Sequence, residues 1–174
     1  AAELLGDHWP WGDFRGGKYS AFEAGTRVPF IVRWPGHVAA NRISDALLSH
    51  IDLYASLAAL CGAALPEGAA PDSRNHLGTL LGTDSEGAEY VVGINLSQTL
   101  SVISDGWKYI APSNAPARNE ATDTEMGNDP AEQLYDLRND PGERRNVAAG
   151  NPGEVARLKA LLDRIKARPP RSGR

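Results

Sequence analysis

An apolar stripe near the C-terminal end sets the strongest limit on how this chain folds. Its members recur at helical spacing, and they are Val155, Leu158, Leu161, Leu162 and Ile165. Asn151 and Pro152 precede the stripe as N-cap and first helical residue, and Glu154 completes a capping-box arrangement. Such a helix is stable in water only when its stripe packs against another element, so the preceding segments must supply an apolar face.

Short segments that are typical of strands precede this helix. They cover residues 89–94, 98–104, 107–110 and 133–137. Asp105-Gly106 predicts a two-residue hairpin turn between the second and third segments. The polar residues 111–131 predict a long loop. The pattern therefore predicts a small four-stranded antiparallel sheet with the final helix on one face.

The first part of the chain has a different character. Residues 1–26 are rich in glycine and aromatic residues and predict a structured loop. The run 27–34 predicts a strand buried on both faces of a mainly parallel sheet, and Asp52 predicts the N-cap of a helix that ends near Gly62. We expect the end of an α/β domain over 1–62, a connector with little regular structure over 63–87, an α+β subdomain over 88–167 and a flexible tail over 168–174.

Charge and composition argue against two classes of partner. The net charge is −4 and the hydrophobic fraction is 41%, as in ordinary globular proteins. We therefore expect no nucleic-acid partner, and no membrane partner because no apolar run reaches the ~18 residues that a span needs. Cys61 is the single cysteine, so no internal disulfide forms, and its apolar neighbours predict a buried thiol.

One constellation in the opening loop suggests chemistry on an anion. It comprises Gly6-Asp7-His8, Arg15-Gly16-Gly17-Lys18 and Glu23. Glycines let the backbone approach a ligand closely, and a lysine can offset charge that builds up on a sulfuryl or phosphoryl group. The same residues also suit a solvated surface loop in which Arg15 pairs with Glu23 or Asp13.

Four segments resemble motifs of the sulfatase family. Residues 15–36 are similar to its "G-x-K" loop, "E-G-G" turn and "R-V-P-x-I-x-x-W-P-G" strand, although Ala24 replaces the first glycine of the turn. Residues 52–62 resemble "D-L-x-x-x-x-x-x-L-x-G", residues 105–109 resemble "G-x-W-K-Y", and residues 134–146 resemble "L-Y-D-L-x-x-D-P-x-E-x-x-N". The matches occur in order, so the chain resembles the C-terminal part of a sulfatase.

The resemblance implies a fold and a mechanism. The family has an alkaline-phosphatase-like α/β domain followed by a smaller antiparallel sheet with a helix. In that family a formylglycine, made from Cys or Ser in a "C/S-x-P-x-R" motif, attacks the sulfur of a sulfate ester. A calcium ion polarises the sulfate, and the lysine of the "G-x-K" loop binds a sulfate oxygen. Lys18 occupies the position of that lysine.

Several family features have no counterpart in these 174 residues. The "C/S-x-P-x-R" motif is missing, since Cys61 is followed by Gly62-Ala63-Ala64, and so is the Asp-rich metal motif. We expect formylglycine and most calcium ligands outside this chain, in a missing N-terminal part of the same domain. No metal ligand is assigned here, because Gly6-Asp7-His8 fits better between the family's metal pair and its lysine.

Three residues are candidate site residues. Lys18 is expected to bind sulfate and act in catalysis, His8 to contact substrate or donate a proton, and Arg15 to contact the substrate anion. The complete protein is expected to hydrolyse a sulfated sugar or aryl sulfate, and the chain alone to be inactive because it lacks the nucleophile. A phosphoester or phosphonate hydrolase of the same superfamily, or a non-catalytic anion-binding module, stays open. The compartment is not fixed by the sequence; the resemblance implies a periplasmic or secreted protein.

Overall fold

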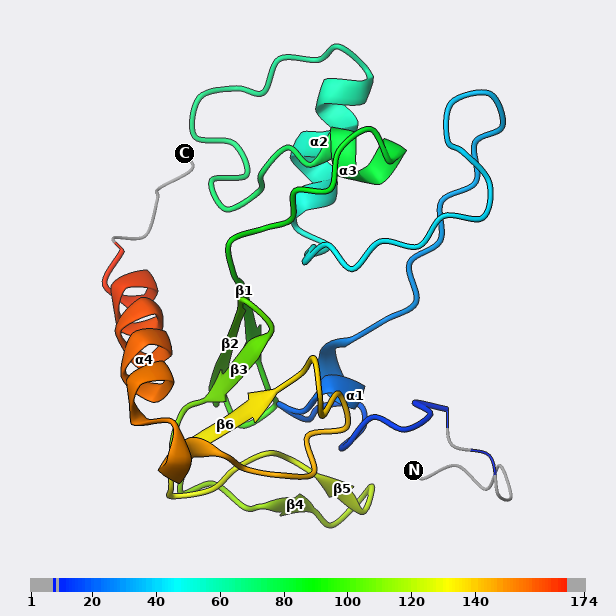
Figure 1. Ribbon diagram of the computed structural model, residues 1–174. Coiled ribbons are helices and arrows are strands. Elements are labelled where there is room, and N and C mark those ends of the chain that lie inside the picture. Colours follow the sequence, from blue (N-terminus) through cyan, green and yellow to red (C-terminus); the bar gives the residue numbers. More distant parts are fainter. Residues whose placement is uncertain (1–7, 9, 169–174) are drawn as a thin grey trace. The chain divides into compact units, whose positions relative to one another are not determined.

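A computed structural model describes His8 and residues 10–168 (Figure 1). Its contacts divide the chain into two compact units, one of residues 1–28 and 92–167 and one of residues 29–91 and 168–174. The assignment of residues 1–62 to a catalytic α/β domain stays a prediction, and the tail after residue 168 lies outside the described residues. No described helix has the length and apolar character required to cross a membrane.

A four-stranded sheet forms the centre of the first unit. Its strands are β1 (Val91–Ile94), β2 (Leu100–Ser104), β3 (Trp107–Ile110) and β6 (Gln133–Asp136), in the spatial order β1-β2-β3-β6. β3 pairs antiparallel with β2 and β6, so that Tyr109 lies opposite Val102 and Leu134. The four predicted strands are confirmed. The predicted hairpin turn is confirmed too, because Asp105 and Gly106 have φ angles of 51° and 72°.

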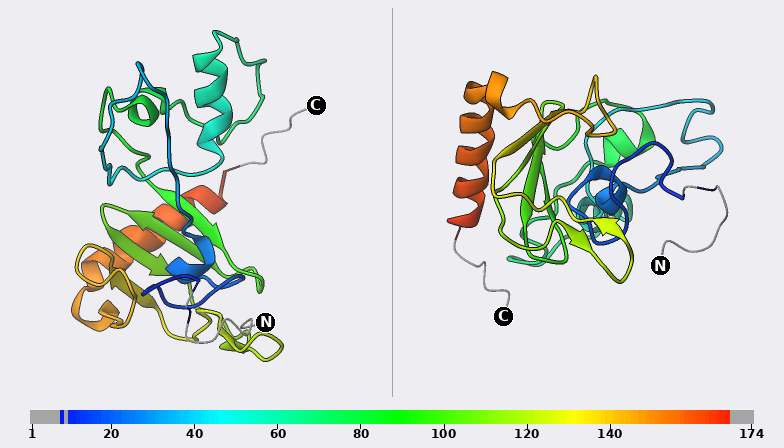
Figure 2. Two further views of the ribbon diagram at one scale, coloured as in Figure 1. Left: turned by 90° about the vertical axis from the view of Figure 1, so that its right-hand side faces the viewer. Right: turned by 90° about the horizontal axis from the view of Figure 1, so that it is seen from below.

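Different elements cover the two faces of this sheet (Figure 2). α4 (Pro152–Lys166) packs on β2 and β3 and buries four residues of the predicted stripe: Val155, Leu158, Leu161 and Leu162. Side chains alternate along β3, so Lys108 and Ile110 point to the face opposite Tyr109. There Ile110 and Tyr135 pack with Phe22 beside the short helix α1 (Glu23–Thr26). The lysine-bearing loop is thus attached to the sheet directly.

The predicted positions of Asn151 as N-cap and Pro152 as first helical residue are confirmed, but the predicted capping box is wrong. The helix begins at Pro152, but the Asn151 side-chain amide donates a hydrogen bond to Val147 O (2.9 Å) and caps no helical N–H. A 3-10 turn, η1 (Ala148–Gly150), directly precedes the helix, and the backbone N–H of Asn151 donates a hydrogen bond to Ala148 O in that turn. Glu154 pairs with Arg157 one turn along the helix instead of closing a capping box (2.8 Å).

The long loop over residues 111–131 is held in place by strand pairing and side-chain hydrogen bonds. It contains a two-stranded hairpin of β4 (Arg118–Asn119) and β5 (Thr124–Glu125). Asn128 is buried next to it, and its Oδ1 accepts hydrogen bonds from Asn95 Nδ2 (2.8 Å) and Thr99 Oγ1 (2.6 Å). Because Asn95 and Thr99 lie between β1 and β2, this network joins the loop to that end of the sheet.

The second unit contains α2 (Asp52–Leu60), which contacts α3 (Leu77–Leu81). The helix predicted after Asp52 is confirmed, although Asp52 is its first residue and not its cap. The buried Asp52 carboxylate accepts backbone hydrogen bonds from Ser49 (3.2 Å) and Arg74 (3.0 Å). α3 lies inside the connector, where little regular structure was expected.

Two further expectations are wrong for the described structure. The segment 27–34 is extended, but no described strand pairs with it, and Ile31 is 88% exposed. An extended segment becomes a strand only when a neighbour accepts and donates its backbone hydrogen bonds, and the described residues provide no such neighbour. Cys61 follows the last residue of α2 and is exposed, whereas its apolar neighbours predicted burial.

We expect Leu158→Ala to lower the free energy of unfolding by about 2–5 kcal/mol, because Leu158 is fully buried between α4 and the sheet. Arg164→Ala on the exposed side of α4 is the control and is expected to change it by less than about 0.5 kcal/mol. Urea denaturation followed by circular dichroism measures both. Equal effects of the two substitutions would contradict packing through the stripe.

Candidate functional site

The lysine loop, defined as residues 15–23, is closed by its own backbone. Ala24 N donates a hydrogen bond to Arg15 O (3.1 Å), which brings the two ends of the loop together. Ala21 N donates to Met126 O (3.0 Å), which fastens the loop to the long loop after β3. The buried residues after Lys18 therefore hold the loop, while Lys18 itself is exposed.

Tight winding gives Tyr19 an uncommon backbone conformation. Its φ angle of 83° lies in the left-handed region, which side chains with a Cβ seldom adopt. Ser20 N donates to Gly17 O (3.0 Å), and Leu96 N donates to Tyr19 O (3.1 Å), so both sides of Tyr19 are fixed. Gly25 is required nearby, because a Cβ at that position would lie 2.1 Å from Ser20 O.

Lys18 presents its charge to solvent. Its Nζ lies 5.1 Å from the centre of the Tyr19 ring, a cation–π contact. No ion pair between Lys18 and a carboxylate occurs within His8 and residues 10–168. An ammonium group without a carboxylate partner is free to bind an anion.

His8 is exposed, and the structure shows no contact between it and Lys18. Gly6 and Asp7, which precede it, lie outside the described residues. The proposed contact of His8 with substrate therefore stays a prediction.

Arg15 is engaged within the protein. Its Nε and Nη2 donate to the two carboxylate oxygens of Glu125 (2.8 and 3.2 Å), and its Nη1 donates to Glu143 O (3.0 Å). The guanidinium also lies 4.1 Å from the centre of the Phe22 ring. The hydrogen bond to Glu125 raises the pKa of Arg15, and the same bond lowers the pKa of Glu125. The ion-pair partner is thus Glu125, and neither Glu23 nor Asp13.

A cluster of buried charges lies at the C-terminal end of the lysine loop. Lys108 is fully buried, and its Nζ lies 2.9 Å from Glu23 Oε1 and 2.9 Å from Glu143 Oε1. Glu143 Oε2 accepts a hydrogen bond from the backbone N–H of Glu23. Arg27 Nη1 lies 3.5 Å from the other oxygen of Glu23. Two cations therefore face two carboxylates, which balances the charge of the cluster.

Burial disfavours the ionised form of Glu143 in this cluster. It raises the pKa of Glu143, and the positive charge of Lys108 and the Glu23 N–H oppose that rise. Removing Lys108 would leave two carboxylates close together inside the protein, which is more unfavourable than the intact arrangement. Glu23, Lys108 and Glu143 are therefore expected to act as one structural unit.

The sequence contained one signal for this cluster. Lys108 stands in the middle of the strand Trp107–Ile110, and a lysine is almost never fully buried unless carboxylates pair with it. The residues that pair with it lie 85 and 35 positions away in the sequence, because they are Glu23 and Glu143. Their convergence was therefore missed, although each belongs to one of the segments that resemble sulfatase motifs.

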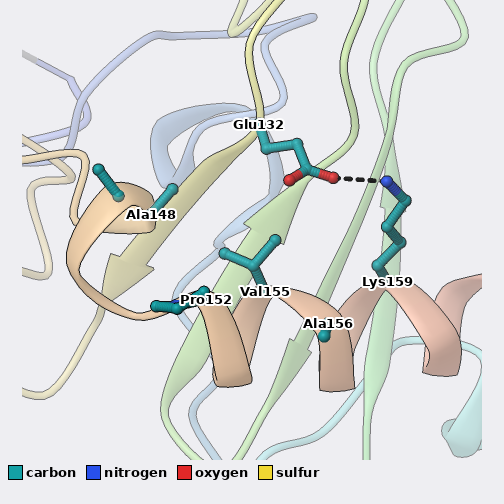
Figure 3. Close-up of a pocket in the computed structure, with 7 residues that line it drawn as sticks. Glu132, Ala148, Pro152, Val155, Ala156 and Lys159 are labelled. Atoms are coloured by element: carbon teal, nitrogen blue, oxygen red, sulfur yellow. Dashed lines mark hydrogen bonds and ion pairs between the residues drawn. The ribbon is translucent and has the colours of Figure 1, made fainter.

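A shallow pocket of about 370 Å³ lies elsewhere, between η1 and α4 (Figure 3). It is lined by Glu132, Ala148, Ala149, Pro152, Val155, Ala156 and Lys159. Glu132 and Lys159 pair with each other at 2.7 Å, so their charges are already satisfied. Lys18, His8 and Arg15 do not line this pocket.

A calcium site would need several oxygen ligands close together. Across His8 and residues 10–168, no group of three or more His, Cys, Asp and Glu is arranged to hold a metal ion. The described residues therefore do not fit a complete calcium site.

Comparisons with known proteins agree with the motifs around the loop. A sulfatase family model matches residues 4–63. An N-acetylgalactosamine-6-O-sulfatase of Bacteroides thetaiotaomicron is 55% identical over 168 residues, which are 97% of this chain and 33% of that protein. Steryl-sulfatase of Mus musculus is 33% identical over 175 residues, covering 90% of this chain and 27% of that protein.

A solved structure gives the same result. It is the structure of a 6S-sulfatase connected with the metabolism of multiple glycosaminoglycans by Bacteroides thetaiotaomicron. It has a TM-score of 0.89 and 55% identity, over 94% of this chain and 34% of that one. These matches place the chain among proteins of the alkaline-phosphatase-like superfamily. Within that class it belongs to the sulfatase family, as the resemblance predicted. The chain spans about a third of the length of these relatives and corresponds to their C-terminal part.

The pair between Arg15 and Glu125 predicts a pH dependence. The pKa of Glu125 is lowered from 4.5, so its pair contributes stability above pH 4.5 that is lost as the pH falls through the folded pKa. We expect Glu125→Gln to destabilise by only about 0.5–1 kcal/mol at ~pH 6, since the pair is partly exposed, and by less at ~pH 3. Urea denaturation at both pH values measures this. A difference that grows at low pH would contradict the assignment.

Strain at Tyr19 predicts a reversal of the usual order of alanine and glycine. Both Tyr19→Ala and Tyr19→Gly remove the ring, but only glycine adopts a φ of 83° freely. We expect the glycine variant to be more stable by about 1 kcal/mol. Ala160→Gly in α4 is the control, where glycine should cost about 1 kcal/mol. Equal stability of the two Tyr19 variants would show that the backbone there is unstrained.

Proposed function

We propose that this chain forms the C-terminal part of a sulfatase that hydrolyses the sulfate ester of a carbohydrate. The observation that carries the proposal is Lys18, an exposed ammonium group on a closed loop, at the position of the family's sulfate-binding lysine. The relative that is 55% identical is an N-acetylgalactosamine-6-O-sulfatase, which supports a sulfated carbohydrate as the class of substrate.

In this proposal Lys18 binds one sulfate oxygen through its ammonium group. As the S–O bond breaks, negative charge is redistributed between the sulfuryl oxygens and the leaving oxygen. A fixed positive charge beside these oxygens stabilises the transition state. His8 is proposed to contact the substrate or to donate the proton that the leaving oxygen needs. Arg15 already donates to Glu125 and Glu143, so its present contacts favour support of the loop over direct contact with the sulfate.

The nucleophile of the reaction is proposed to lie outside these 174 residues. A formylglycine in that position would supply the oxygen that attacks sulfur, and calcium ligands are proposed to lie there too. The chain described here would then contribute the lysine loop and the sheet that supports it.

The test compares variants of the complete sulfatase on 6-O-sulfated N-acetylgalactosamine. We expect Lys18→Ala to lower kcat/KM by about 10²-fold or more, because a charge that stabilises the transition state is lost. Lys166→Ala, which removes an exposed lysine of α4, is the matched control and should leave kcat/KM unchanged. The 174-residue chain by itself should give no turnover above its own Lys18→Ala variant.

The outcomes separate the alternatives. Faster hydrolysis of the corresponding phosphate ester would indicate a phosphoester hydrolase. Binding of the sulfated sugar without turnover of either ester by the complete protein would indicate a non-catalytic module. Full activity of Lys18→Ala would rule out the proposed role of this residue.

A further inference from the structure

Glu143 contacts both ends of the lysine loop. Its backbone oxygen accepts a hydrogen bond from Arg15 Nη1 (3.0 Å), at the N-terminal end. Its carboxylate accepts a hydrogen bond from Glu23 N, at the C-terminal end, and lies 2.9 Å from Lys108 Nζ. A residue 120 positions beyond Glu23 thus contacts both ends of the segment that carries Lys18.

Lys18 depends on its loop for its position. Its own described contact is the cation–π contact with the adjacent Tyr19, which moves with the loop. A long side chain of this kind has several rotatable bonds, and no described carboxylate pairs with it, so the backbone decides where its ammonium group can reach. Displacing the ends of the loop would therefore displace the sulfate-binding charge.

The contacts of Glu143 are well suited to hold the loop rigidly. Its side chain and that of Lys108 are fully buried, and Glu23 is 4% exposed. Electrostatic interactions between such groups are stronger than on the surface because water does not screen them. Glu143 has a φ angle of 51° in the turn after β6, where its N–H donates a hydrogen bond to Asp140 O (3.1 Å). Asp140 N in turn donates to Asp136 O (2.8 Å) at the end of β6, so the turn connects Glu143 to the sheet.

We propose that Glu143 is a positioning residue that holds the lysine loop at both ends and thereby sets the geometry in which Lys18 binds sulfate. This inference rests on the proposed function, because it assigns Glu143 a role through Lys18. It differs from a purely structural role in one respect: the effect of changing Glu143 on activity must depend on the presence of Lys18.

A double-mutant cycle in the complete sulfatase tests that dependence. kcat/KM on 6-O-sulfated N-acetylgalactosamine is measured for the wild type, Glu143→Gln, Lys18→Ala and the double variant. We expect Glu143→Gln to lower kcat/KM about tenfold when Lys18 is present and less than about twofold when it is absent. Titration calorimetry with inorganic sulfate should show the same pattern in affinity, without any need for turnover.

Two controls accompany the cycle. Glu143→Asp keeps the charge but withdraws the carboxylate from Lys108 and Glu23 N, so it should lower kcat/KM at least as much as Glu143→Gln and show the same dependence on Lys18. It also keeps the test independent of whether one variant folds. Lys159→Met removes a lysine from an exposed ion pair with Glu132, and it should change neither kcat/KM nor sulfate affinity.

The result that overturns the inference is additivity, in which Glu143→Gln and Glu143→Asp lower kcat/KM by the same factor with and without Lys18. In that case Glu143 stabilises the fold only. If instead Lys18→Ala alone leaves kcat/KM and sulfate affinity unchanged, the proposed function of Lys18 fails and the inference fails with it. The two failures are therefore distinguishable from the same four proteins.

Discussion

The contacts of buried Lys108 with Glu23 and Glu143 are the interaction on which the rest of the first unit depends. A fully buried ammonium group is unfavourable without carboxylate partners, and each carboxylate is equally unfavourable without the ammonium. The three residues come from a helix, a strand and a turn that are far apart in the sequence. The sheet, α1 and the turn after β6 must therefore come together to satisfy all three of these charges.

This dependence explains how an exposed loop keeps a defined shape. The lysine loop is rich in glycine, and it would be mobile if only its neighbours in sequence held it. Contacts with distant parts of the chain hold it instead: Arg15 binds Glu125, Ala21 binds Met126, and Glu23 binds Lys108. The strain at Tyr19 is tolerated because these contacts fix the backbone on both sides of it.

Elements with a strong local pattern could be predicted from the sequence. α4 and the four strands follow from hydrophobic periodicity, and the turn at Asp105-Gly106 follows from the residues themselves. The strand expected over residues 27–34 was wrong because a strand needs a neighbour, which periodicity does not reveal. Asn151 is the N-cap as predicted, but the capping box was wrong because the Asn151 side chain bonds to Val147 O before the 3-10 turn and not to a helical N–H. In the candidate site, Lys18, Arg15 and Glu23 were found from the sequence. Their partners Glu125, Lys108 and Glu143 were not identified because they come from segments remote in sequence.

The buried cluster also gives a physical meaning to the segments that resemble sulfatase motifs. Glu23 belongs to the turn motif, Lys108 to the "G-x-W-K-Y" strand and Glu143 to the last motif, and the structure brings the three together. Replacing Lys108 would leave two buried carboxylates without their ammonium group, whereas replacing Glu143 would still leave Lys108 paired with Glu23. Three separated segments are in this way coupled by electrostatics, although only the loop between Arg15 and Glu23 carries a residue that is expected to contact sulfate.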